Sequence, residues 1–217
     1  MNILLFIYCL IPFALGVPSG KIIAKLKGID IQSHGSGNTG AANMHRTLGW
    51  KYGLLTLLID VSKSYLVVKF LSEMFYPIFS SGMIVPVSLE FFRCAFAVAL
   101  ILGNVFSPFL RFTGGKGIAT AAGAILGIAP WVLMVGLISF GMFLFFTEIV
   151  SLSSIVAIVS ATSASLVFYF LFNLHISAFC FSSTVFLVIL WTHRKNLARL
   201  QNGTEPKFIL KKKNPSS

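Results

Sequence analysis

Apolar runs long enough to cross a membrane dominate the hydrophobic pattern of this chain. They cover about residues 3–19, 52–72, 83–110, 118–146, 149–172 and 175–191. A transmembrane helix needs about 20 apolar residues to cross the hydrocarbon core of a bilayer. The pattern therefore predicts an all-α polytopic membrane protein.

Composition supports this prediction. Of 217 residues, 56% are hydrophobic and only 11% are charged, with a mean hydropathy of +0.88, whereas roughly a quarter of a soluble domain is charged. No basic residue precedes the first apolar run, and Lys21, Lys25 and Lys27 follow it, so we expect a retained span rather than a signal peptide. We expect residues 1–210 to form one membrane domain and residues 211–217 to form a basic tail that contacts anionic lipid.

The distribution of the net charge of +11 predicts the orientation. Lysines and arginines gather at 21–51, at Arg111 and Lys116, and at 194–213, and basic loops face the cytoplasm. Glu73, Glu90 and Glu148 then mark the outer loops. We expect an outside N-terminus and a cytoplasmic C-terminus. A nucleic-acid partner has no support, because no basic soluble surface remains outside the spans.

The number of crossings must be even between two segments on the same side. Three runs, 118–146, 149–172 and 175–191, separate the second basic segment from the third, so one of them should be short, re-entrant or divided. Pro130, Gly136 and Gly141 are the candidate break points, because irregular backbone is tolerated at membrane depth only where protein or water surrounds it.

Three polar segments on the predicted cytoplasmic face carry the candidate chemistry. Glycine-rich turns expose backbone N–H groups that bind phosphate oxygens, and Arg46 and Lys116 add positive charge. We therefore predict an oxyanion or phosphate site, with tight turns and close helix packing as the alternative role of the glycines. The segments contain Gly35, Ser36, Gly37, Asn38, Thr39, Gly40, Asn43 and Arg46; Gly114, Gly115, Lys116 and Gly117; and His193, Asn196, Arg199 and Glu205.

Known nucleotide motifs do not account for these glycines. Gly35, Gly37 and Gly40 spell G-x-G-x-x-G, but no βαβ unit surrounds them and Asp60 lies within an apolar run. Lys116 is followed by Gly117 where a Walker A loop needs Ser or Thr.

Asp60 and Lys63 share a helical face and could form either a structural ion pair or a functional one. We expect no cofactor and no metal, because no cysteine and histidine cluster has metal-ligand spacing.

Together the three segments resemble the bacterial membrane glycerol-3-phosphate acyltransferases that use acyl phosphate, often called PlsY. The matching residues are GSGNTGAANMHRTLGWKYG at 35–53, GGKGIAT at 114–120 and HRKNLARLQNGTEPKF at 193–208. The resemblance implies about seven transmembrane helices, some short or partial, whereas hydropathy alone favours five full spans. It also implies acyl transfer from acyl phosphate to the sn-1 hydroxyl of glycerol 3-phosphate, giving lysophosphatidic acid and phosphate in the first step of phospholipid synthesis.

The resemblance also implies roles for individual residues. Ser36, Arg46 and Lys116 would hold phosphate groups with the neighbouring amides, and His193 and Asn196 would bind glycerol 3-phosphate or its hydroxyl. His193, Ser36 and Lys116 are the catalytic candidates, and Asp60, Lys63, Arg199 and Glu205 would support the site. The general base is either His193 or the donor phosphate, and we favour the phosphate.

The chain departs from the family pattern at three positions, Asn104, Thr192 and Ser64. His, Arg and Gly, respectively, are expected there. The alternatives to an active acyltransferase are therefore a divergent inactive paralogue and, from another class, a membrane transporter for organophosphates or other anions. A transporter would place its glycine loops near the midplane in two related halves.

Overall fold

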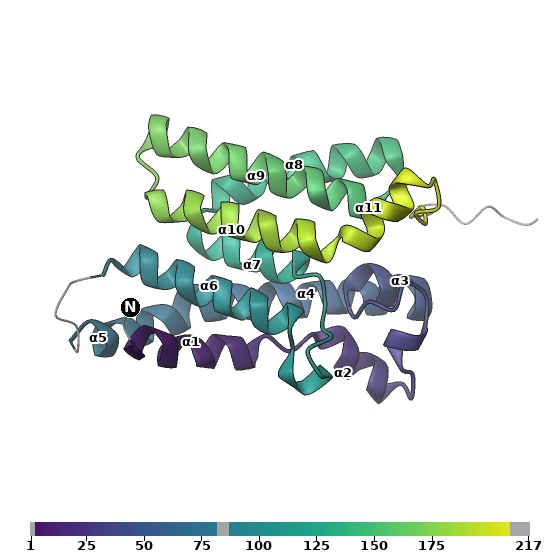
Figure 1. The fold of residues 1–217 in the computed structure, drawn as a ribbon, viewed down its shortest axis with the longest axis horizontal. Helices are drawn as coiled ribbons and strands as arrows, with labels where there is room; N and C mark the ends of the chain where they lie inside the picture. The colour runs from purple at the N-terminus through teal and green to yellow at the C-terminus, as the bar shows by residue number, and fades with distance from the viewer. Residues whose placement is uncertain (1–2, 82–86, 209–217) are drawn as a thin grey trace, which may run out of the picture.

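The computed structural model describes residues 3–81 and 87–208, and within these ranges the chain is helical with no strand (Figure 1). The first half contains α1 (Ile3–Leu15), α2 (Ser19–Leu26), α3 (Ala41–Leu48), α4 (Trp50–Leu66), a π-helical turn (Val67–Leu71) and α5 (Ser72–Ser81). The second half contains α6 (Leu89–Val105), α7 (Ile118–Ile128), α8 (Pro130–Thr147), α9 (Val150–Phe172), α10 (Ile176–Thr192) and α11 (Arg194–Gln201). Short 3₁₀ turns cover Ile31–Ser33 and Pro108–Leu110.

Four segments are long and apolar enough to cross a membrane, or five if α10 and α11, bent by 58° at their junction, are one span. The four are Leu5–Leu26, Leu89–Leu110, Pro130–Thr147 and Val150–Phe172. The run expected at 52–72 is helical, but it is not one of these four candidate spans. It carries the charged residues Asp60, Lys63 and Lys69. The seven-helix count and the orientation of the termini stay predictions, and the basic tail lies outside the described residues.

The divided run predicted from topology is 118–146. It breaks into α7 and α8 at Ala129, with Pro130 as the first residue of α8. Proline suits the first turn of a helix because its missing N–H would be unpaired there. Gly136 and Gly141 lie inside α8, so only Pro130 marks the break.

The assignment of Glu148 to the outer loops was wrong. Because 118–146 forms two helices, the connection between α8 and α9 returns to the end of the bundle that holds the three polar segments. There Glu148 Oε2 lies 3.8 Å from Lys207 Nζ, and the Glu148 carbonyl accepts from Phe208 N at 2.6 Å.

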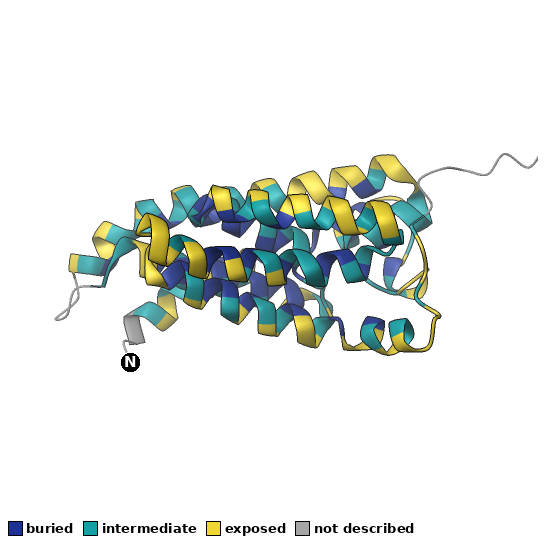
Figure 2. Cartoon of the chain, turned by 90° about the horizontal axis from the view of Figure 1, so that it is seen from above, coloured by how far each residue is buried: buried dark blue, intermediate teal, exposed yellow. Residues whose placement is uncertain are grey.

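Aromatic and small residues hold the bundle together around α6. Phe92 is fully buried and stacks on Phe79 with ring centroids 4.5 Å apart. The ring centroid of Phe96 lies 4.6 Å from that of Phe92. A Cβ at Gly103 would overlap the backbone of Phe13, so this glycine lets α1 and α6 approach closely. Buried residues gather inside the bundle and exposed ones on the outside of α8 and α9 (Figure 2), where Phe146 is 77% exposed and suits contact with lipid.

Asp60 and Lys63 stabilise the break between α1 and α2. Pro18 interrupts the helix, and α2 begins at Ser19. Asp60 Oδ1 accepts from Ser19 N at 3.2 Å, and Lys63 Nζ donates to the Val17 carbonyl at 2.7 Å. The two side chains are 3.3 Å apart. The pair therefore satisfies backbone groups that the break leaves without helical partners.

Candidate active site

The three polar segments meet around one cavity at the end of the bundle opposite the N-terminus (Figure 1). Its volume is about 550 Å³. Gly35, Gly37, Gly114, Lys63 and Arg199 lie outside its lining. The predicted residues that do line it are Ser36, Asn38, Thr39, Gly40, Asn43, Arg46, Asp60, Gly115, Lys116, Gly117, His193, Asn196 and Glu205.

Asn43 shapes the first glycine loop from inside. Its Nδ2 donates to the carbonyls of Ile31, His34 and Asn38 at 3.3, 3.0 and 2.9 Å, and its Oδ1 accepts from Ser36 N at 2.8 Å. The side chain is 2% exposed. These bonds occupy both ends of the amide, so Asn43 is suited to positioning the loop rather than to binding phosphate.

Two helices point their N-termini into the cavity. α3 begins at Ala41 and α7 at Ile118, and Ala41, Ala42, Ile118 and Ala119 line the cavity. Among the described residues, the N–H groups of these four find no backbone acceptor. Free N–H groups and the helix dipole favour an anion at both places.

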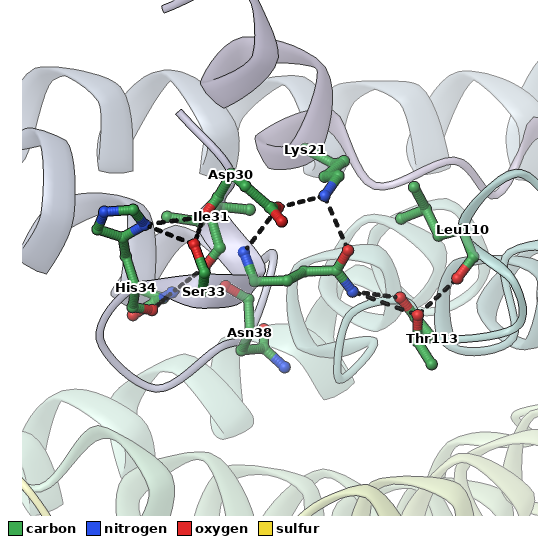
Figure 3. A network of polar contacts seen from close by, with 10 residues as sticks. Lys21, Asp30, Ile31, Ser33, His34, Asn38, Leu110 and Thr113 are labelled. Atoms are coloured by element: carbon green, nitrogen blue, oxygen red, sulfur yellow. Dashed lines mark hydrogen bonds and ion pairs between the residues drawn. The ribbon is translucent and has the colours of Figure 1, made fainter. Parts of the chain in front are cut away.

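A network at the edge of the bundle fixes the two glycine loops relative to each other (Figure 3). Lys21 Nζ donates to Asp30 Oδ1 and Gln32 Oε1 at 2.5 and 2.9 Å, and Gln32 Nε2 donates to the Thr113 carbonyl at 3.0 Å. Gly115 N donates to the Asn104 carbonyl at 2.9 Å. The second loop is therefore tied to both the first loop and α6.

Lys116, Asn196 and Glu205 form a chain of hydrogen bonds. Lys116 Nζ donates to Asn196 Oδ1 at 2.5 Å, and Asn196 Nδ2 donates to Glu205 Oε1 at 2.6 Å. Glu205 also accepts from Arg199 Nε at 2.7 Å and from Ser151 Oγ at 2.8 Å. Asn196, only 3% exposed, thus holds the ammonium of Lys116 in the cavity.

Burial and charge shift the pKa values of this group. Burial lowers the pKa of Lys116 to about 8, with Glu205 opposing the shift and the cations of Arg199 and Arg46 adding to it. Burial would raise the pKa of Glu205, but the hydrogen bonds from Arg199, Asn196 and Ser151 outweigh it and lower the pKa. The cavity therefore holds a carboxylate and an ammonium that still carries its proton at neutral pH.

His193 lies at the bend between α10 and α11 and is 2% exposed. Its Nδ1 is 2.9 Å from the Ile189 carbonyl. A carbonyl only accepts, so this contact places a hydrogen on Nδ1 and leaves Nε2 as the acceptor nitrogen of a neutral ring.

Arg46 reaches the cavity from α3 and touches the segment after α11. Its Nη2 donates to the Pro206 carbonyl at 3.4 Å, while its Nε is buried with no partner in the described part of the chain. Burial lowers the pKa of Arg46, and Glu205 opposes this. His45 packs on Phe208 with ring centroids 4.7 Å apart. Residues 205–208 therefore close one side of the site.

Residues that the sequence did not single out for the site also line the cavity. Thr120 stands in the first turn of α7, and Ser151 and Ser154 stand at the start of α9. Asn104 was noted only as a departure from a family pattern, yet it faces the cavity from the last turn of α6. Polar residues at helix ends beside the glycine loops were the available signal for Asn104 and Thr120.

The other two departures have structural roles. Thr192 Oγ1 donates to the carbonyl of Lys116 at 3.2 Å and so ties the third segment to the second. Ser64 is fully buried, and its Oγ donates to the Asp60 carbonyl at 2.7 Å.

The cavity extends from this polar end onto an apolar wall. Leu54 and Leu57 of α4 and Phe140 and Leu144 of α8 line it. Leu54 and Leu57 are 45% and 39% exposed, so this wall is continuous with the outer surface of α4.

Comparisons with known proteins match the chain over nearly its full length. Residues 5–203 match the family model described as glycerol-3-phosphate acyltransferase. A glycerol-3-phosphate acyltransferase of Staphylococcus carnosus is 39% identical over 207 residues, covering 94% of this chain and 96% of the relative. One of Bacillus cytotoxicus is 35% identical over 213 residues, covering 96% and 97%.

Two solved structures share the fold. The crystal structure of PlsY (YgiH), an integral membrane glycerol 3-phosphate acyltransferase, in its glycerol 3-phosphate form superposes with a TM-score of 0.80 at 29% identity, covering 94% of this chain and 96% of that one. The lysophosphatidic acid form gives 0.76 at 30% identity, covering 94% of each chain.

Proposed function

This chain belongs to the glycerol-3-phosphate acyltransferase family, and from that premise we propose that it transfers a fatty acyl group from acyl phosphate to the sn-1 hydroxyl of glycerol 3-phosphate. The products are lysophosphatidic acid and inorganic phosphate. We propose that the site faces the cytoplasm at the bacterial inner membrane, in keeping with the basic residues of all three segments.

One observation carries the choice of donor. A single cavity joins a cationic end, with two helix N-termini, Arg46 and Lys116, to an apolar wall open to the outer surface of the bundle. An amphiphile with a phosphate head and a fatty chain fits both parts. Acyl-CoA and acyl carrier protein carry the same chain on a much larger head group, so the compact cationic end of the cavity is what favours acyl phosphate.

The chemistry needs no covalent intermediate. An acyl phosphate is a mixed anhydride, so positioning and stabilisation of phosphate charge suffice. The sn-1 oxygen of the acceptor bonds to the acyl carbonyl carbon, and the bond between that carbon and the phosphate oxygen breaks. The phosphate leaves with the electron pair, stabilised by Lys116, Arg46 and the free amides.

The proton of the acceptor hydroxyl passes to the departing phosphate in the route we favour. His193 Nε2, the acceptor nitrogen of the ring, is the alternative base. A His193→Gln variant separates the two: complete loss of rate with unchanged affinity for glycerol 3-phosphate would return the base role to His193.

The test is reconstitution in lipid. Purified protein with palmitoyl phosphate and glycerol 3-phosphate should release phosphate and form lysophosphatidic acid, detected by mass spectrometry. Acyl-CoA and acyl carrier protein serve as competing donors. Lys116→Ala should cut phosphate release sharply, and Lys51→Ala, at an exposed lysine, is the matched control for loss of one charge. No product from any donor would refute acyl transfer, and product from another donor alone would refute acyl phosphate.

An organophosphate transporter has less support. The first glycine loop lies at the end of the bundle opposite the N-terminus (Figure 1). Alternating access requires a site near the midplane, between two related halves.

A further inference from the structure

Three neutral polar side chains line the cavity without being satisfied by a neighbour that the structure describes. Thr39, Asn104 and Thr120 are 0%, 3% and 1% exposed, and all three line the cavity. The hydroxyls of Thr39 and Thr120 are buried with no hydrogen-bond partner in the described residues. The Asn104 side chain lies next to Gly115 in this lining.

Gly115 lets two of these groups lie close to the second glycine loop. A Cβ built on Gly115 would lie 2.8 Å from Asn104 Oδ1 and 3.3 Å from Thr39 Oγ1, so a side chain at this position would crowd both oxygens. All three side chains line the same cavity. Buried polar groups are nearly always paired, so the two hydroxyls beside Asn104 that lack a partner in the described chain indicate a polar ligand atom in this cavity.

The chemistry of these three side chains indicates which kind of ligand atom they would bind. Phosphate oxygens are served elsewhere in the cavity, by Arg46, Lys116 and the free amides of α3 and α7. An amide and two hydroxyls carry no net charge, and they offer both donors and acceptors. That set matches an alcohol, which donates one hydrogen bond and accepts others.

We propose that Asn104, with Thr39 and Thr120, binds the secondary hydroxyl of glycerol 3-phosphate and so selects a polyol phosphate as acceptor. The proposal rests on the proposed function and adds specificity-determining residues to it. The reacting primary hydroxyl then lies toward the acyl donor, and the phosphate lies against the cations.

The test compares two acceptors, glycerol 3-phosphate and 3-hydroxypropyl phosphate, which lacks the secondary hydroxyl. Asn104→Ala should lower kcat/KM about tenfold with glycerol 3-phosphate, the loss of one neutral hydrogen bond, and less than twofold with the analogue. Thr39→Val and Thr120→Val should act in the same direction. Wild-type protein should prefer glycerol 3-phosphate at least tenfold.

Ser107→Ala is the matched control, because the Ser107 hydroxyl is also buried and unpartnered in the described chain but lies outside the cavity lining. It should change neither acceptor's kcat/KM. Equal losses on both acceptors, in variants whose melting temperature is unchanged, would overturn the hydroxyl site, as would a wild type that does not discriminate. A wild type inactive with both acceptors would instead overturn the proposed function.

Discussion

Deprotonation of Lys116 should lower the activity of the enzyme as the pH rises through 8. Its pKa is about 8 in the free protein, so about nine-tenths of the molecules carry the ammonium at pH 7 and about one-tenth at pH 9. A substrate phosphate has its second pKa near 6, so its charge is constant over this range. If only the protonated form binds, kcat/KM should fall about tenfold between pH 7 and pH 9, because apparent affinity scales with the competent fraction.

The assay is phosphate release at subsaturating glycerol 3-phosphate between pH 6 and 10, corrected for spontaneous hydrolysis of the donor. Under these conditions kcat/KM reports groups of the free enzyme. Lys116→Arg should be less active, because the guanidinium is larger and differently shaped, but its profile should stay flat because arginine keeps its proton. Lys51→Ala should keep the wild-type profile. The reasoning fails if Lys116→Arg shows the same alkaline fall as wild type.

Three further outcomes are expected. Asp60→Asn should lower the unfolding free energy by about 1–3 kcal/mol, because the charge that Lys63 contacts is lost, with little change in KM; unchanged melting in detergent would contradict this. Gly115→Ala should lower activity, since its Cβ would displace the Asn104 side chain, whereas Gly141→Ala, with open space around it, should be silent; equal rates in the two variants would contradict a role for Asn104 in the site. Treatment with a chelator should leave phosphate release unchanged, and loss of activity reversed by a divalent ion would show that a metal takes part.

Local pattern predicted much of the architecture. Run lengths and composition indicated the helices, and the even-crossing rule required a broken run, which the structure divides at Pro130. The same run, counted as one crossing, put Glu148 on the wrong side. Hydropathy does not distinguish one long apolar helix from two short ones that meet at a turn.

Site residues were predictable as a group but not one by one. Glycine spacing and charge identified the three segments that meet at the cavity. Roles such as that of Asn43, whose amide is taken up by the loop it supports, depend on contacts between atoms that only folding brings together. Thr120 ends the GGKGIAT motif and Asn104 lies outside all three segments, and neither was assigned a role before the structure placed both in the cavity lining.

The bend at His193 has a consequence for biogenesis. Because His193, Asn196 and Glu205 come from the third segment, while Lys116 and Arg46 come from earlier ones, a nascent chain released before these residues are inserted would hold an incomplete phosphate site. Under the proposed function, acyl transfer would therefore start only after α10 has docked against the rest of the bundle.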